Sequence, residues 1–195
     1  MRRTNNRQRL MRTCIAGIIA SLYTVLTVLV GSFGLANGAI QLRVSEALCV
    51  LPFFTSAAIP GLTVGCLLSN LLLACPWQDI VFGTLATLIG AVGAYWLRRC
   101  VWLIPLPTVI SNTVIVPLVL AYAYHAEEGI PFLMLTVGIG EVISAYILGM
   151  IFLLALRRNR AFLQMMSFDG GTKYEYEHQK REPDDPASSA SQQSD

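Results

Sequence analysis

Charged residues are scarce in this sequence: only 13% of its 195 residues are Asp, Glu, Lys or Arg. A water-soluble domain usually carries roughly a quarter. The deficit is concentrated in the middle of the chain, where the 144 residues from 13 to 156 contain eight charges. Hydrophobic residues make up 54% of the chain, more than a soluble core of this size needs. These deviations exclude a soluble globular protein and predict an integral membrane protein that crosses the lipid bilayer several times.

Common catalytic and nucleotide-binding motifs are also missing. The sequence contains no G-x-x-x-x-G-K-[ST] loop with which to bind and hydrolyse ATP by itself. It has no G-x-S-x-G or H-E-x-x-H motif, and His125 and His178 lie outside the apolar segments. The five cysteines form no C-x-x-C pair, which favours small apolar filler over a zinc or disulfide site. We therefore expect a protein that is not an enzyme and that uses no metal or cofactor.

Six apolar segments are candidates for membrane-spanning helices, which need roughly 20 residues each. The second segment is short and contains Gln41, Arg43 and Glu46, so a re-entrant or interfacial segment is an alternative to a span. The six candidates are residues 14–33, 40–54, 57–75, 80–97, 101–124 and 130–156.

The positions of the basic residues distinguish six spans from five, because short cytoplasmic loops collect Lys and Arg. With six spans and the amino terminus inside, 13 of the 14 basic residues lie on the cytoplasmic side, and the exception is Arg43. With five spans, Arg98, Arg99 and the cluster that begins at Arg157 would lie outside. We therefore predict an all-α protein with six transmembrane helices and both termini cytoplasmic. Arginines at the ends of apolar segments also argue against nucleic-acid binding.

This topology divides the chain into three regions. Residues 1–13 are a basic cytoplasmic amino terminus, residues 14–156 are the six-helix transmembrane domain, and residues 157–195 are a polar cytoplasmic tail that we expect to be disordered. An alternative for the amino terminus is a signal peptide cleaved near residues 36–39. Its apolar run is longer than a typical signal core, however, and its removal would break the charge pattern.

Polar residues inside the predicted spans are candidates for a ligand site, because ionisable groups in a bilayer are costly and usually face a cavity or each other. Arg43 and Glu46 are three residues apart, so they share a helical face and can form an ion pair. The candidates are Arg43, Glu46, Asn70, Asn112 and Glu141.

Each candidate also has a structural interpretation. Arg43 and Glu46 could be a neutralised pair that fixes the second segment. Asn70 and Asn112 could be hydrogen-bond partners between helices. Glu141 is the hardest to explain in this way, because no basic residue lies nearby in its own span. Such a carboxyl group has to be protonated, paired across helices or exposed in a cavity.

Prolines shape two further expectations. Asp79 follows Pro76 at the start of the fourth segment and is expected to be the N-cap of that helix. The fifth segment contains Pro105, Pro107 and Pro117, which predicts a kinked or locally unwound helix. Carbonyl groups freed in such a helix can face a ligand.

Several motifs together are specific enough to suggest a family. The run QLRVSEAL at residues 41–48, followed by LPFF at 51–54, resembles a signature of the QueT family. These are queuosine-precursor transporters, the substrate-binding (S) components of energy-coupling factor (ECF) transporters. The likeness covers about residues 14–156, and its further motifs are AIPGL at 58–62, GCLLSN at 65–70, DIVFGTLATL at 79–88 and the pair Gly140-Glu141.

The resemblance implies an S component in the bacterial plasma membrane, with a six-helix fold and a ligand cavity that opens to the outside. It also implies partners: a transmembrane coupling protein and two ATPase subunits that supply the energy. S components commonly carry an Ala-x-x-x-Ala pattern where the coupling protein docks on the first helix. Ala16 and Ala20 match this pattern, and small residues four apart let two helices approach closely.

The ligand that the resemblance implies is a 7-deazaguanine base in its aminomethyl or cyano form, or queuine. Glu46 and Glu141 would bind the adjacent N–H donors of the guanine-like edge and an aminomethyl cation, while Asn70 and Asn112 would satisfy the carbonyl and ring nitrogens. Phe33 or Trp77 would stack on the base, although interfacial anchoring explains Trp77 equally well. Residues 32–38 would form a lid.

Three alternatives remain open on the sequence alone. The first is an S component for another vitamin or base. The second is a self-sufficient secondary transporter in which Glu141 carries a proton, and the third is an intramembrane enzyme.

Overall fold

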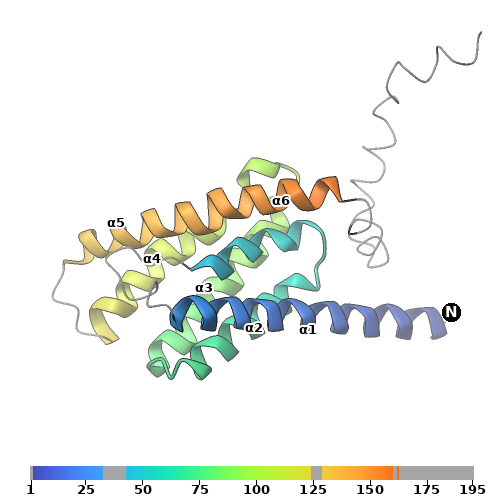
Figure 1. The fold of residues 1–195 in the computed structure, drawn as a ribbon, viewed down its shortest axis with the longest axis horizontal. Coiled ribbons are helices and arrows are strands. Elements are labelled where there is room, and N and C mark those ends of the chain that lie inside the picture. Colours follow the sequence, from blue (N-terminus) through green and yellow to red (C-terminus); the bar gives the residue numbers. More distant parts are fainter. Residues whose placement is uncertain (1, 33–42, 124–128, 160–161, 163–195) are drawn as a thin grey trace, which may run out of the picture.

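The computed structural model describes residues 2–32, 43–123, 129–159 and 162, and its ordered elements there are all helical (Figure 1). No strand occurs in this part of the chain, which confirms the all-α prediction. In chain order the elements are α1 (Arg2–Ser32), η1 (Val44–Phe53), α2 (Ala58–Leu72), α3 (Trp77–Trp96), η2 (Val101–Leu103), α4 (Leu106–Ala123), α5 (Ile130–Glu141), η3 (Val142–Leu148) and α6 (Gly149–Arg158).

Successive segments run in alternate directions along the long axis of the molecule (Figure 1). α1, α2 and α4 run one way, while η1, α3 and the helix formed by α5, η3 and α6 run the other way. The start of α1 and the end of α6 therefore lie at the same end of the bundle. This is the order of directions that a chain with six crossings needs.

Four of these helices are long and apolar enough to cross a bilayer by themselves, which agrees with a multi-pass membrane protein. They cover residues 6–32, 77–96, 101–122 and 130–158. The apolar helices η1 and α2 are shorter, with 10 and 15 residues. Six full crossings and cytoplasmic termini therefore stay predictions.

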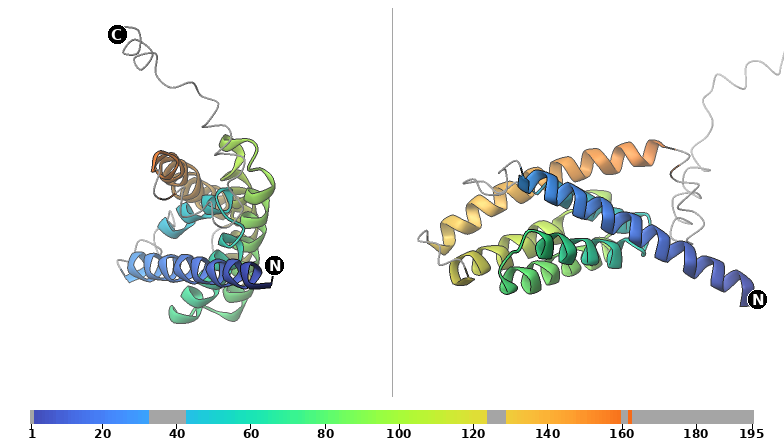
Figure 2. Two further views of the ribbon diagram at one scale, coloured as in Figure 1. Left: turned by 90° about the vertical axis from the view of Figure 1, so that its right-hand side faces the viewer. Right: turned by 60° about the horizontal axis from the view of Figure 1, so that its bottom comes forward.

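The second predicted span is a ten-residue 3₁₀ helix, η1, with Pro52 inside it. At about 2 Å per residue it extends roughly 20 Å, less than the roughly 30 Å of the hydrocarbon core. Seven of its residues are buried, and it lies between α1 and α6 in both Figure 1 and the left view of Figure 2. This burial favours an interior segment over an interfacial one.

Prolines and tight turns set the ends of the central helices. The fifth predicted span is locally unwound as expected, because η2 ends at Leu103 and α4 begins only at Leu106. The N-cap prediction for Asp79 was wrong. α3 begins at Trp77 with Pro76 as its N-cap, and Asp79 lies in the first turn. The turn before it passes through Ala74 at φ 51°, a left-handed conformation that few residues other than glycine adopt.

The bundle has an apolar exterior and a partly polar interior. Large apolar side chains such as Ile18, Leu72 and Ile151 are 60% or more exposed, whereas twelve polar or charged residues within the described ranges are buried. A soluble protein distributes these side chains the other way round. The apolar surface suits lipid as the surrounding solvent, and the buried polar groups mark the part of the molecule where a ligand can be recognised.

Candidate ligand-binding site

All five site residues that the sequence suggested lie in the interior of the bundle. Glu46, Asn70, Asn112 and Glu141 are at most 4% exposed, and the Arg43 side chain is 19% exposed. Arg43, Glu46 and Glu141 lie within electrostatic range of one another, although Arg43 precedes η1, Glu46 lies in it and Glu141 ends α5. The structure thus brings together side chains that are far apart in the sequence.

Glu46 has both carboxylate oxygens occupied by donors from its own chain. The Tyr23 hydroxyl of α1 donates to Oε1 at 2.6 Å, and the Cys49 thiol donates to Oε2 at 3.0 Å. Next to this contact the Thr27 hydroxyl donates to Ser45 Oγ at 2.8 Å, so two hydrogen bonds join α1 to η1. Glu46 is therefore held in place within the fold.

Arg43 forms its ion pair with a residue other than the predicted one. Its Nη2 lies 3.9 Å from Oδ2 of Asp79 on α3, whereas the sequence had suggested Glu46 as a possible partner. Arg43 is the N-cap of η1, with φ −105° and ψ 86°. Its backbone is therefore not helical, and the shared helical face that the three-residue spacing assumed does not apply to it. The salt bridge joins η1 to α3.

Asn70 completes this connection. Its Nδ2 donates to the Asp79 carbonyl oxygen at 3.3 Å and to Cys66 Sγ at 3.8 Å. Gly83 leaves room for the contact, because a Cβ there would lie 3.2 Å from Asn70 Nδ2 and 3.3 Å from Asp79 Oδ1. We call Tyr23, Arg43, Glu46, Asn70 and Asp79 the paired cluster.

A second set of buried polar atoms, on α4, α5 and η3, has no hydrogen-bond partner among the described residues. Burying such atoms without partners is costly, so native proteins rarely do it without a ligand, water or ion to satisfy them. We call these residues the unpaired cluster: Thr108 (Oγ1), Asn112 (Nδ2), Thr113 (Oγ1), Glu141 (Oε2) and Ser144 (Oγ).

Helical spacing groups the members of the unpaired cluster. Thr108 and Asn112 are four residues apart on α4 and so share a helical face, whereas Glu141 ends α5 and Ser144 follows three residues later in η3. The Asn112 amide lies beside the Glu141 carboxyl group without forming a hydrogen bond of good geometry. An amide donor thus lies next to a carboxyl acceptor.

The backbone is irregular at the same place. η3 is a π-helical stretch that begins directly after Glu141 and contains Ser144. π-helical turns interrupt the regular α-helical hydrogen-bond pattern, and they occur frequently at functional sites. Here the wider turn changes the direction in which Ser144 leaves the helix relative to Glu141.

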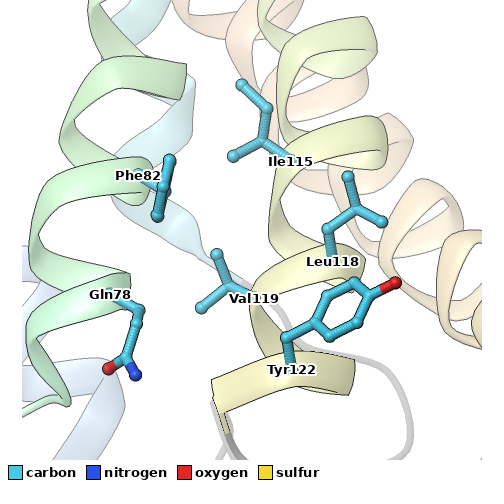
Figure 3. Close-up of a pocket in the computed structure, with 6 residues that line it drawn as sticks. All are labelled: Gln78, Phe82, Ile115, Leu118, Val119 and Tyr122. Atoms are coloured by element: carbon cyan, nitrogen blue, oxygen red, sulfur yellow. The ribbon is translucent and has the colours of Figure 1, made fainter.

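A separate groove of about 410 Å³ lies between α3 and α4 (Figure 3). Its walls are apolar, with the amide of Gln78 at one end, and the hydroxyl of Tyr122 points away from Gln78. Phe82, Leu118 and Tyr122 are also exposed on the outer surface of the bundle. This groove therefore suits a hydrocarbon chain better than a purine-like base.

The small residues predicted to dock a coupling protein face the neighbouring helix of the same chain. A Cβ on Gly61 of α2 would lie 2.8 Å from the carbonyl oxygen of Ala16, and one on Gly65 would lie 2.9 Å from that of Ala20. Ala20 is 6% exposed. By contrast, a Cβ on Gly17 would meet nothing within 4 Å. Ala16 and Ala20 thus pack α1 against α2, and Gly17 lies on the open side.

Other predicted features have different outcomes. Trp77 is 66% exposed, in agreement with an anchoring position at the membrane interface rather than stacking inside the bundle. Phe33, Gln41, the lid segment after Ser32 and most of the tail lie outside the described residues. The division into three regions stays a prediction, although α1 already begins at Arg2, within the basic segment.

Sequence reasoning missed two residues of the interior, Tyr23 and Cys49. Both contact Glu46. A tyrosine in the middle of an apolar span was the available signal, because a buried Tyr hydroxyl usually needs a partner. Cys49 gave no such signal, since cysteine is common as small apolar filler.

Comparison with known proteins gives a consistent result. Residues 13–158 match the QueT transporter family, which confirms the resemblance seen in the motifs. Over 72 residues the chain is 42% identical to the queuosine precursor transporter QueT of Lactococcus lactis subsp. cremoris (strain MG1363). That stretch covers 37% of this chain and 42% of the relative, so the match spans less than half of either protein. No solved structure matches the chain.

Proposed function

Because the chain belongs to the QueT transporter family, we propose that it captures a queuosine precursor, a 7-deazaguanine base, inside its helix bundle for import into the cell. The observation that carries this proposal is the unpaired cluster: buried donors and acceptors that the described residues leave without partners. A purine-like base offers the complementary groups. Transport leaves the substrate chemically unchanged, so no catalytic residue is needed.

Asn112 and Glu141 are the proposed direct contacts. A side-chain amide has one donor group and one acceptor, so Asn112 can donate to the base carbonyl and accept from the adjacent ring N–H. Glu141 accepts from a further donor of the ligand through its free Oε2. Arg43, Glu46 and Asn70 line the same interior, but their polar groups are used in the paired cluster. Their proposed role is to position the binding site.

We further propose that the chain works as the S component of an ECF importer in the bacterial plasma membrane, with six crossings and both termini cytoplasmic. A coupling protein and two ATPase subunits would supply the energy, because the sequence has no phosphate-binding loop of its own. α1 is the proposed docking helix: Ala16 and Ala20 hold it close to α2, and Gly17 leaves its open side accessible.

Equilibrium binding of 7-aminomethyl-7-deazaguanine to the purified full-length chain in nanodiscs tests ligand capture. Guanine and queuine serve as competitors. Saturable binding that guanine does not displace supports the proposal, whereas no binding of any deazapurine by folded protein contradicts it. Gly17→Trp is then expected to abolish copurification of the coupling subunits while leaving ligand binding unchanged.

A second function is favoured by one observation, the buried Glu141 carboxyl group with its free oxygen. Such a group can carry a proton through the membrane and couple import to the proton gradient. Uptake by cells that lack the ATPase subunits, lost when the gradient is collapsed, would favour this secondary transporter. Uptake that requires the ATPase subunits favours the ECF proposal.

A further inference from the structure

We propose that the groove between α3 and α4 is a lipid site that binds one acyl chain of a membrane phospholipid and recognises the chain rather than the headgroup. The groove shares no lining residue with the paired or the unpaired cluster, so its occupant is separate from the transported base. Its walls are Gln78 and Phe82 of α3 and Ile115, Leu118, Val119 and Tyr122 of α4.

The way in which α3 packs against α4 creates the groove. Near the end of α3 the two helices touch, because Gly90 has no side chain: a Cβ there would lie 2.9 Å from Thr108 Cα. Toward the start of α3, Gly83 faces Asn70 of α2 instead of α4. Larger side chains line the two facing helices at that end, and a space is left between them (Figure 3).

The groove is long and narrow. Its lining residues on α4 recur at positions 115, 118, 119 and 122, which form one helical face over two turns. This interval is roughly 10 Å long, so the volume of 410 Å³ corresponds to a cross-section of about 40 Å². An α-helix with its side chains is about 10–12 Å across, with a cross-section of roughly 80 Å² or more. A single hydrocarbon chain therefore fits into the groove, whereas a helix of a partner protein does not.

The polar groups of the groove lie at one of its ends. Gln78 is in the first turn of α3 and Tyr122 is in the last turn of α4 (Figure 3). Trp77 precedes Gln78 and is exposed, and Trp and Tyr are enriched where the hydrocarbon core meets the headgroups. Phe82 and Ile115 lie further along the two helices. A phospholipid has the same order of parts, with its headgroup at the membrane interface and its acyl chains deeper.

The groove opens onto the apolar outer surface of the bundle. Val119 is buried and forms its floor, whereas Phe82 and Leu118 at its rim are exposed. Beyond the rim, the exposed side chains of Leu85 on α3 and Val114 on α4 continue the apolar surface. Walls without an occupant would lose van der Waals contacts, and the surrounding bilayer supplies hydrocarbon chains to restore them.

The described residues that line the groove carry no charge. Selective recognition of anionic headgroups uses clusters of Lys and Arg. The polar end of this groove has an amide and a hydroxyl group instead. We therefore expect the groove to accept zwitterionic and anionic phospholipids equally, because the acyl chain makes the contacts.

Photolabelling of the full-length chain in nanodiscs tests the lipid site. Phosphatidylcholine and phosphatidylglycerol, each with a diazirine group in one acyl chain, are used separately, and the labelled residues are mapped by mass spectrometry. The exposed apolar residues of α1 between positions 18 and 29 report ordinary contact with the bilayer. We expect both lipids to label residues 116–122 about fivefold more strongly than α1, because contacts from two walls hold the chain longer.

Two variants remove the site from opposite walls. Ile115→Trp fills the groove and should reduce the labelling of residues 116–122 to the level of α1. Phe82→Ala removes the facing wall and should also reduce it, which keeps the test decisive if Ile115→Trp does not fold. Ile110→Trp is the matched control, because Ile110 is exposed on the same helix and does not line the groove. It should leave the labelling unchanged.

Other outcomes overturn the proposed site. Even labelling of α1, α3 and α4 would mean that the groove holds no lipid more firmly than the rest of the surface. Unchanged labelling in folded Ile115→Trp would place the lipid elsewhere. Labelling by phosphatidylglycerol alone would contradict recognition through the acyl chain, and photocrosslinks between two copies of the chain would make a second copy the occupant. None of these outcomes affects the binding of a deazapurine, so the proposed function is tested separately.

Discussion

The paired and unpaired clusters use similar residues for different purposes. In the paired cluster, on α1, η1, α2 and α3, Glu46 and Asn70 have partners within the chain, and Arg43 joins Asp79. In the unpaired cluster, on α4, α5 and η3, one carboxyl oxygen, an amide nitrogen and three hydroxyl groups have no hydrogen-bond partner among the described residues. Polar groups in a membrane protein can thus either join helices to one another by hydrogen bonds and ion pairs or be available to bind a ligand. Residue type alone does not distinguish these roles. The presence or absence of a hydrogen-bond or ion-pair partner within the chain does.

The largest expected effect is on stability, from breaking the ion pair of the paired cluster. Arg43→Met leaves Asp79 buried without its cation, and we expect a loss of about 3 kcal/mol in the free energy of unfolding. Thermal unfolding in detergent measures it. The double variant Arg43→Met with Asp79→Asn should recover part of the loss, because it removes both charges. A double variant no more stable than Arg43→Met would contradict this pairing.

The substitution Tyr23→Phe is the next test of the paired cluster. It deprives Glu46 Oε1 of the donor at 2.6 Å, and an unsatisfied buried acceptor costs about 1–3 kcal/mol. We expect a lower unfolding temperature with a ligand affinity that stays within about threefold of the original, because Glu46 is not a direct contact. If the affinity falls while the stability stays constant, Tyr23 belongs to the ligand site.

The substitution Asn112→Leu tests the unpaired cluster and should have the opposite pattern. It removes an amide donor that has no partner and keeps a similar side-chain volume. We expect the ligand affinity to fall about tenfold or more, since one or two hydrogen bonds to the ligand are lost. The unfolding temperature without ligand should be unchanged or higher. A marked loss of stability would place Asn112 among the residues that hold the fold.

The smallest expected effects come from one hydroxyl group in each cluster. Thr27→Val removes the hydrogen bond to Ser45 and should cost about 1 kcal/mol of stability. Ser144→Ala removes a hydroxyl group without a partner and should leave stability within about 0.5 kcal/mol. Ligand titrations should show the reverse, with weaker binding only for Ser144→Ala. Equal effects of the two substitutions on stability would contradict the proposed difference in role between the clusters.

Much of the fold could be predicted from the sequence, because hydrophobic length and charge position are local properties. The apolar segments correspond to helices, and the proline-rich start of the fifth segment is unwound as expected. The second segment is the exception. Its composition is apolar enough for a span, but residues 44–53 form a 3₁₀ helix surrounded by other helices. Its short length and charged residues left a re-entrant or interfacial segment open as an alternative, but tertiary packing decides between these outcomes.

The sequence predicted which residues belong to the candidate site, but it did not predict which of them form contacts with one another. Ionisable and amide side chains in apolar segments identified the residues of the interior. Which of them satisfy one another depends on contacts between distant segments, such as Arg43 with Asp79 and Tyr23 with Glu46. The same limitation applies to Ala16 and Ala20, whose spacing indicated close helix packing but not that α2 is the neighbour.

The most direct test of the account compares thermal unfolding of Tyr23→Phe and Asn112→Leu with and without 7-aminomethyl-7-deazaguanine. A ligand that binds the folded state raises its unfolding temperature. We predict that Tyr23→Phe unfolds at a lower temperature and keeps the ligand-induced increase, whereas Asn112→Leu keeps its stability and loses the increase. A full ligand-induced increase in Asn112→Leu would contradict the assignment of the unpaired cluster as the ligand site.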